Sequence, residues 1–452
     1  MKKTLFAICI FPLLIFSCEL FNSKDFDLFG DFWAVNFVTN KFYRVDAHLA
    51  AQNDLVEIWI EQGADVSKTQ AIQTANYYRD IIYPRMKNYF FWEKDINNVP
   101  MDTMQYANFL VNGDGRLTVL LLDIIDGHVP GEGFIGGYFD QTNFFNSANS
   151  NRRAMIYIDI DPLQVGSDLF YGTIAHEMQH LMNSVTNSLY IAQGIRSGNI
   201  ELWINEGLSE SAEWVVLEKT NPHRLTWYNL DNTGLISQGS TFFVWINYGN
   251  TPGSVLNDYS TVYLFFQWLR LQTDNNVYQR IFTSPFTNFN AVIDALNGTP
   301  LYGKSWGDLM RAWYAANFFN NPEGKYGYEG ALNVVAPLPK TIATSVSLFP
   351  GEGVFSKLNG NFSRPIVPNI KYSSLNSSGV DADFDYNSST LFTQNINTSI
   401  SGVASPGMTT GIPPERPDNQ TSIPSGRSLH SAASEIYGPH RICVAELLGQ
   451  KN

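Results

Sequence analysis

Two histidines and a glutamate in one short segment, His-Glu-Met-Gln-His, have the clearest capacity for chemistry in this sequence. His176 and His180 are four residues apart, so on a helix their rings project from one face about one turn apart. Two imidazoles at that separation can occupy two corners of a tetrahedral zinc site, and Glu177 can reach a water at an open coordination position. The spacing therefore predicts a zinc site with a base beside it.

The residues around this motif favour a helix. Apolar positions recur at helical spacing and a capping residue precedes them; these are Ile174, Met178 and Leu181, with Ser167 or Asp168 as the cap. The alternative is an amphipathic helix whose histidines and glutamate are merely solvated. The HExxH spacing, in a chain with only 7 histidines, favours the metal site.

A zinc site needs a third protein ligand, whose position separates the classes of zinc peptidase. One class continues the motif to HExxHxxGxxH, and Asn183 and Thr186 at the corresponding positions exclude it. Residues 203 to 210, WINEGLSE, resemble the gluzincin peptidases, in which a WxNEG or NExxS[DE] segment supplies a carboxylate. The resemblance makes Glu206 the third zinc ligand. It makes Glu210, one turn further on, a carboxylate that hydrogen-bonds a ligand histidine.

Carboxylates at helical spacing on their own are more often a solvated acidic stripe. Glu206, Glu210 and Glu213 have that spacing, and the upstream motif favours the ligand interpretation for Glu206. Glu213 is interpreted as a surface residue. Gly207 inside a helix costs about 1 kcal/mol relative to alanine, which a close approach of the two metal-bearing helices would explain.

The order of elements is similar to that of the hyicolysin-type neutral zinc metallopeptidases, over about residues 50 to 320. The similarity covers two apolar strands, a Gly-Gly-Tyr segment, the two metal helices and a later Tyr-rich helix. Zinc aminopeptidases share the WxNEG element but also carry a GxMEN segment, which this sequence lacks. The resemblance implies a metalloendopeptidase of polypeptide substrates, with an aminopeptidase as the alternative.

The resemblance also implies a mechanism. Neutral His176 and His180 with anionic Glu206 leave one zinc position for water, whose pKa zinc lowers toward about 7. Glu177 would take the proton of that water and pass it to the leaving amine. A later helix would supply a hydrogen-bond donor to the oxyanion, for which the candidates are Tyr263, Tyr259 and His223. A tyrosine in so apolar a stretch is more often part of a core.

The N-terminus predicts export from the cytoplasm. Lys2 and Lys3 precede an apolar run over residues 5 to 16 that is too short to span a membrane, which is typical of a secretory signal peptide. Ser17-Cys18 resembles the cleavage box of bacterial lipoproteins. We therefore expect a signal peptide over residues 1 to 17 and a lipid on Cys18 that anchors the chain in the bacterial cell envelope. The alternative is an ordinary cleaved signal and a secreted protein.

Composition restricts the class of partner. The net charge of −13 disfavours nucleic acid or an anionic lipid surface as the main partner. An apolar share of 44% with 16% charged residues is typical of a globular protein.

The remaining pattern predicts an α+β fold, with a mixed-sheet part followed by a mainly helical, zincin-like part. Apolar runs at 55–60, 117–125 and 155–160 predict strands, and the glycine-rich residues 131 to 137 are interpreted as a loop. One helix is expected from Ser67 to Pro84, and others near 168–183, 203–217, 259–271, 289–296 and 306–319.

Four regions are expected along the chain. A tether and N-terminal segment at 18–50 follows the signal peptide, and a zinc metallopeptidase domain spans 51–335, strand-rich to 165 and helical from 166. Residues 336–452 are rich in Ser, Asn and Pro, which predicts a small β-domain or a partly flexible tail. A second hypothesis is a surface adhesin on a peptidase scaffold, with this C-terminal region as its binding surface.

Overall fold

The computed structural model describes residues 28–91, 102–129, 133–231, 234–239 and 254–335, followed by shorter stretches at 347–348, 351–357, 369–376, 379–381, 390–395, 407–408 and 440–446. The expected signal peptide and Cys18 lie outside these residues. Within them, no helix combines the length and the apolar character needed to cross a membrane.

A seven-stranded mixed sheet forms the N-terminal part, in the order β1-β2-β3-β4-β6-β5-β13. Its strands are β1 (Phe29–Asn36), β2 (Lys41–Gln52), β3 (Val56–Glu61), β4 (Leu117–Leu122), β5 (Gly133–Asp140), β6 (Met155–Asp159) and β13 (His440–Glu446). The central strands β3, β4 and β6 are parallel to one another. Both β4 and β6 are buried along their whole length, as their continuous apolar character predicts.

Two sequence expectations differ from this sheet. Strands β1 and β2 form an antiparallel pair that continues into β3, so the expected boundary at residue 50 falls inside β2. Residues 29–36 and 41–50, within the expected tether and N-terminal segment, are therefore strands of the sheet. The described part of the expected loop at 131–137 is the strand β5. Gly137 has a packing reason, because a Cβ there would lie 2.8 Å from Thr173 and 2.9 Å from the Tyr157 carbonyl.

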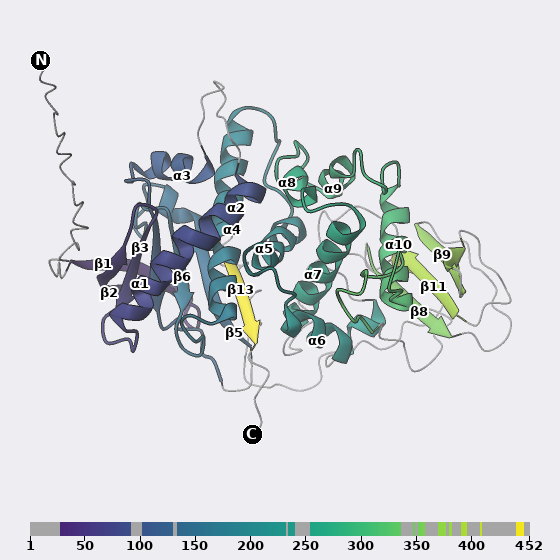
Figure 1. Cartoon of the computed structure of the whole chain (residues 1–452), viewed down its shortest axis with the longest axis horizontal. Coiled ribbons are helices and arrows are strands. Elements are labelled where there is room, and N and C mark those ends of the chain that lie inside the picture. The colour runs from purple at the N-terminus through teal and green to yellow at the C-terminus, as the bar shows by residue number, and fades with distance from the viewer. Residues whose placement is uncertain are drawn as a thin grey trace, which may run out of the picture.

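The helical part follows the sheet, as expected (Figure 1). The α-helices are α1 (Lys68–Tyr77), α2 (Tyr83–Phe90), α3 (Thr103–Val111), α4 (Asp168–Ala192), α5 (Leu202–Leu217), α6 (Pro222–Leu230), α7 (Ser254–Gln272), α8 (Val277–Phe282), α9 (Phe289–Ala295) and α10 (Trp306–Phe319). Short helical turns lie at η1 (Tyr78–Ile82), η2 (Gln141–Phe144) and η3 (Ile236–Gln238).

The first of these helices does not end at Pro84, as the sequence predicted. It passes through the π-helical turn η1 into α2, where Pro84 lies in the first turn. The π-helical turn before Pro84, in which the Tyr83 N–H donates to the Tyr78 carbonyl, interrupts the regular α-helical bonding at the point where the proline lacks an N–H. Helices α3, α6 and α8 were not predicted from the sequence.

The C-terminal described strands form smaller sheets. A four-stranded sheet has the order β10-β9-β11-β8, and its strands are β8 (Gly353–Lys357), β9 (Ile370–Asn376), β10 (Gly379–Asp381) and β11 (Thr390–Asn395). Strands β7 (Ser347–Leu348) and β12 (Gly407–Met408) form a separate pair. The larger sheet packs on α10, where Phe355 and Phe392 contact Tyr314. In Figure 1 it lies at the opposite end of the molecule from β1.

Candidate metal centre

Helices α4 and α5 carry the predicted ligands into one buried cluster. The first helix begins at Ser167, whose Oγ accepts a hydrogen bond from the Phe170 amide at 3.1 Å. Helix α4 packs on the sheet on one side, where a Cβ at Gly137 would lie 3.1 Å from the Glu177 Cγ. On another side, helix α4 packs on α5. The side chains of His176, Glu177 and His180 are all buried as a result.

The three predicted ligands face one another. The Nε2 atoms of His176 and His180 lie 3.5 Å and 3.3 Å from the same oxygen of Glu206, Oε2. One ligand atom from each of the three residues fits within a 4.8 Å span. The other oxygen of Glu206 is buried and has no hydrogen-bond donor among the described residues. Two imidazoles and one carboxylate form a donor set that suits Zn²⁺, so the residues fit the metal.

The electrostatics of the cluster favour a charged Glu206. Burial raises the pKa of this carboxyl, but the two imidazoles, His180 foremost, outweigh burial and hold the pKa below its usual range. The carboxyl of Glu206 is therefore anionic, which is the form in which a carboxylate binds a cation.

His180 is oriented by Ser209 from α5. The Ser209 Oγ lies 3.0 Å from Nδ1 of His180 and also donates toward two acceptors, the Gln179 side-chain oxygen and the Asn205 carbonyl. Because a hydroxyl has one proton and both of those groups can only accept, the N–H at Nδ1 of His180 donates to Ser209. This tautomer leaves the Nε2 lone pair facing Glu206.

Gly207 lets a third helix approach, and not the one that the sequence suggested. A Cβ at Gly207 would lie 2.6 Å from Cζ of Phe266, and closer still to two other ring carbons. Phe266 belongs to α7, so the glycine accommodates the packing of α7 on α5 and not that of α4 on α5. The predicted close approach is present with a different partner.

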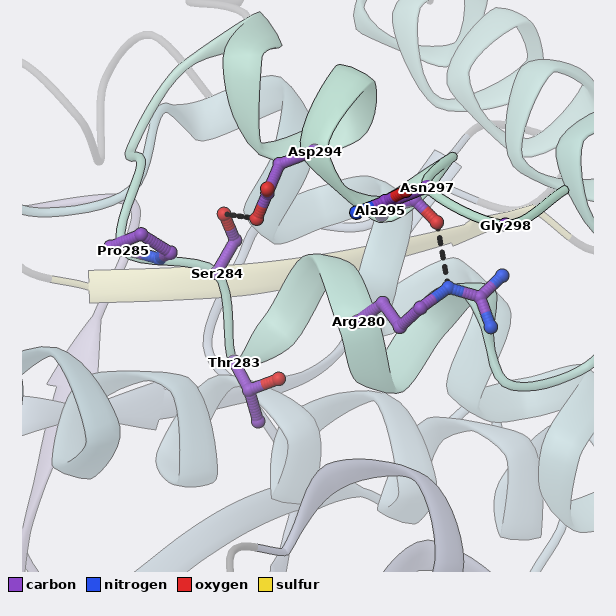
Figure 2. Close-up of a pocket in the computed structure, with 8 residues that line it drawn as sticks. All are labelled: Arg280, Thr283, Ser284, Pro285, Asp294, Ala295, Asn297 and Gly298. Carbon is purple, nitrogen blue, oxygen red and sulfur yellow. Dashed lines mark hydrogen bonds between the residues drawn. The ribbon is translucent and has the colours of Figure 1, made fainter. Parts of the chain in front are cut away.

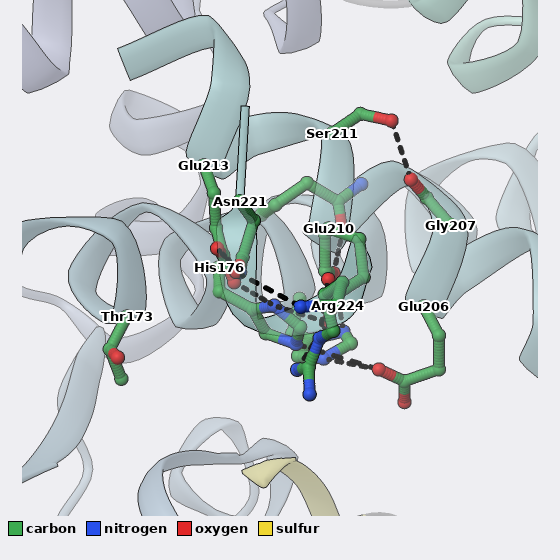
Figure 3. Close-up of polar contacts among 12 residues, drawn as sticks. Thr173, His176, Glu206, Gly207, Glu210, Ser211, Glu213, Asn221 and Arg224 are labelled. Atoms are coloured by element: carbon green, nitrogen blue, oxygen red, sulfur yellow. Dashed lines mark hydrogen bonds and ion pairs between the residues drawn. The ribbon is translucent and has the colours of Figure 1, made fainter. Parts of the chain in front are cut away.

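Two further carboxylates of α5 lie behind the ring of His176. Glu210 and Glu213 are both buried, with their Oε1 atoms 3.8 Å and 3.4 Å from Nδ1 of His176. Figure 3 shows Glu206 and Glu213 on opposite sides of this ring, with Arg224 of α6 beside Glu210. Glu213 is therefore not the surface residue that the sequence indicated.

The three candidate oxyanion donors do not lie at one point. Tyr259 is buried with its ring centroid 6.4 Å from that of His176, and the Arg224 guanidinium lies 4.7 Å above the Tyr259 ring. The hydroxyl of Tyr263 accepts a hydrogen bond from the Asn221 amide at 2.8 Å. His223 is half-buried on α6, and burial and then Arg224 lower its pKa.

Four residues of this site were not predicted from the sequence. They contact the predicted ligand histidines or the carboxylates behind them, and they are Ser209, Glu213, Asn221 and Arg224. A signal was present for one of them. Glu213 follows Glu206 by seven residues and Glu210 by three, which places all three on one helical face. The roles of Asn221 and Arg224 follow only from the position of α6.

A pocket of about 430 Å³ lies away from the metal cluster, between α8 and α9 (Figure 2). Its polar side chains are engaged with neighbours: Ser284 donates to Asp294 at 3.0 Å, and Arg280 donates to the Ala295 carbonyl at 2.6 Å. Arg280 also pairs with Asp274. These contacts satisfy the lining, and the chemistry is concentrated at the buried cluster of α4 and α5.

The sequence is similar to that of a known protease. It is 28% identical over 345 residues to the neutral metalloprotease ShpI of Staphylococcus hyicus, with 73% of each chain covered. The similarity supports a metallopeptidase family. No protein-family model matches the chain. Together with the buried histidine and glutamate cluster, the relative implies a metal cofactor and polypeptide substrates.

Proposed function

We propose that this protein is a zinc-dependent metalloendopeptidase of the gluzincin type that hydrolyses peptide bonds in proteins or peptides outside the cytoplasm. The observation that carries the proposal is the convergence of His176, His180 and Glu206 from two helices, with Glu177 next to the first ligand in the chain. The similarity to a neutral metalloprotease supports the same activity.

Each residue of the cluster has a distinct role in the proposed reaction. His176, His180 and Glu206 would hold the zinc ion, which when bound supplies Lewis acidity and a water of lowered pKa. Glu177 accepts the proton of the attacking water and delivers it to the leaving amine. Its buried position against β5 keeps this proton transfer away from bulk solvent.

Tyr259 is the favoured oxyanion donor among the three candidates. It is the candidate whose ring lies near that of the proposed ligand His176, with the Arg224 guanidinium 4.7 Å from its ring centroid. Tyr263 is less suitable because its hydroxyl is engaged with the Asn221 amide. His223 lies on α6, and no described contact joins it to a ligand.

The decisive experiment compares Glu177→Ala with the wild-type protein. Zinc content is measured by elemental analysis, and hydrolysis is followed with casein and with acetylated peptides. We expect one bound zinc in both proteins, a fall in hydrolysis of about 10²–10⁴-fold in the variant, and inhibition of the wild type by a chelator. Glu323→Ala, which removes an exposed carboxylate, is the matched control and retains activity.

Each other outcome points to an alternative. A hydrolysis rate that is unchanged both by the chelator and by Glu177→Ala contradicts the proposal. Cleavage only of peptides with a free amino terminus identifies an aminopeptidase. A protein that binds a polypeptide without turnover, equally well with and without Glu177, is the adhesin of the second hypothesis.

We also propose that the mature chain is a lipoprotein of the bacterial cell envelope, anchored through Cys18. The support is the N-terminal sequence, with its short apolar run followed by Ser17-Cys18. Labelling with a fatty-acid analogue in an expressing bacterium tests it, with Cys18→Ser as the comparison. Equal labelling of the two proteins contradicts the lipid anchor, and release of unlabelled wild-type protein into the medium indicates ordinary secretion.

A further inference from the structure

Glu213 is a buried carboxylate that the ligand set does not use. Its side chain is 7% exposed although the sequence indicated a surface residue. One oxygen, Oε1, lies 3.4 Å from Nδ1 of His176, on the side of the ring away from Glu206. A buried carboxylate must be paired or hydrogen-bonded, because an uncompensated buried charge would strongly destabilise the fold.

Glu213 is held in place from a separate helix. Its second oxygen, Oε2, accepts a hydrogen bond from the Asn221 side-chain amide at 2.8 Å. Asn221 is itself fixed, since it caps α6 and its backbone amide donates to the Tyr263 hydroxyl at 2.8 Å. The carboxylate lies beside Gly172 of α4, where an added Cβ would be in ordinary van der Waals contact with Glu213 Oε2 at 3.6 Å. Each oxygen of Glu213 therefore has one assigned partner.

The sequence resemblance predicted that Glu210 would hydrogen-bond a ligand histidine. In the structure, its carboxylate pairs with Arg224 instead. Arg224 donates to both of its oxygens, from Nε at 2.9 Å and from Nη2 at 2.6 Å. Its nearer oxygen is 3.8 Å from Nδ1 of His176, which is too long for a hydrogen bond. Arg224 thus pairs with Glu210, and Glu213 is the carboxylate closer to Nδ1 of His176.

We propose that Glu213 is the positioning residue of the ligand His176. Its carboxylate accepts a hydrogen bond from the Nδ1 N–H of His176, which fixes the ring and the tautomer and directs the Nε2 lone pair toward Glu206 and His180. The proposal rests on His176 being a metal ligand, as the proposed function requires. Helix α5 then provides both a ligand, Glu206, and the residue that orients a ligand of the neighbouring helix.

A second cation is the competing use of the same atoms, because His176, Glu210 and Glu213 also form a compact group. The Arg224 guanidinium already lies against this group and supplies a positive charge there. Zinc stoichiometry separates the two ideas, since positioning predicts one ion per chain and a second site predicts two.

The test is a Zn²⁺ titration of the full chain against a competing chromophoric chelator, with thermal unfolding of the metal-free protein measured in parallel. In Glu213→Gln a single carbonyl oxygen faces two donors, so one contact is lost. We expect zinc affinity to fall by about 10–100-fold with one ion bound. The control Glu210→Gln weakens the Arg224 pair, so we expect it to lower the unfolding temperature more than the zinc affinity.

Asn221→Ser is the second variant, in case Glu213→Gln does not fold. Serine preserves the helix cap and leaves the Glu213 charge in place but removes its amide partner, so zinc affinity should fall in the same direction by a smaller factor. Unchanged zinc affinity in the folded Glu213 or Asn221 variant, or two zinc ions per chain, overturns the proposal. Because zinc binding is measured without substrate, wild-type protein that binds one zinc but hydrolyses nothing refutes the proposed function and not this inference.

Discussion

Two regions of this molecule bury carboxylates and surround them differently. On α5 each buried acid has a donor or a cation against it: two imidazoles at Glu206, Arg224 at Glu210, and Asn221 with a ligand histidine at Glu213. On α7, Asp258 is 1% exposed, and one of its carboxyl oxygens has no hydrogen-bond partner among the described residues.

The pKa values follow this difference in surroundings. Burial raises the pKa of Glu206 and Glu213, but the neighbouring histidines outweigh it and lower both below the usual range. At Asp258 burial raises the pKa well above the usual range, and a second acid, Glu352, raises it further. Glu206, Glu213 and Asp258 are all buried, but the direction of the pKa shift differs because the neighbouring groups differ. On α5 the neighbours favour ionised Glu206 and Glu213, but burial raises the pKa of Glu210 to about 7 despite the Arg224 guanidinium. The surroundings of Asp258 on α7 favour a protonated carboxyl.

The largest effect should come from removing the cation of the first region. Arg224→Ala leaves Glu210 buried without its partner, and we expect a loss of about 3–5 kcal/mol in the free energy of unfolding. Arg311→Ala is the matched control, because it removes a more exposed arginine from a pair with Asp308, where about 0–1 kcal/mol is expected. Urea unfolding measures both. Equal losses would mean that burial of the pair at Glu210 has no energetic consequence.

Metal removal should affect the first region alone. With free zinc at about 100 times its dissociation constant, binding stabilises the folded state by about 2.7 kcal/mol, so a chelator should lower the unfolding temperature. Glu206→Gln should lose most of this chelator-dependent shift, while Asp258→Asn should retain it in full. A shift that persists in Glu206→Gln would place the bound ion elsewhere.

The second region should respond to pH. A carboxyl whose folded-state pKa lies above its unfolded value contributes stability at low pH that is lost as pH rises through the folded-state pKa. Asp258→Asn avoids that loss, so it should raise the free energy of unfolding by roughly 1–3 kcal/mol at pH 8. The gain should vanish near the ordinary pKa of 3.8. Thermal melts from pH 4 to 8 test this, with exposed Asp54→Asn as the control; a gain independent of pH would contradict it.

The smallest effect should come from the partner of Glu213. Asn221→Ser retains a capping side chain for α6 but loses the amide that donates to the carboxylate. We expect a loss of about 1 kcal/mol in the free energy of unfolding of the metal-free protein. Differential scanning fluorimetry can resolve a change of this size. Stability equal to the wild type would show that the Asn221 contact contributes nothing measurable without the metal.

The local parts of this fold could be predicted from the sequence. Helical periodicity alone puts His176 and His180 on one face, and apolar continuity predicted the buried strands β4 and β6. Strands β1 and β2 were missed because their exposed and buried residues mix, as in sheet strands with one solvated face.

What the sequence could not provide is the identity of distant neighbours. The burial of Glu213 depends on α6, which lies beyond the end of α5, and the partner of Gly207 depends on how α7 packs. Spacing showed that Glu206, Glu210 and Glu213 share a face. It could not show that Arg224 would engage the middle one and leave the last for His176.

The site also depends on the packing of Gly207, where there is no room for a larger side chain. The ring of Phe266 occupies the space where any other residue would carry its Cβ, and Gly207 directly follows the proposed ligand Glu206 in the chain. One added methyl group would have to push α5 and α7 apart, which carries the Glu206 carboxylate with it. We expect a chain altered only at this position to keep every proposed ligand, the proposed base and every charge, and yet to bind zinc more weakly.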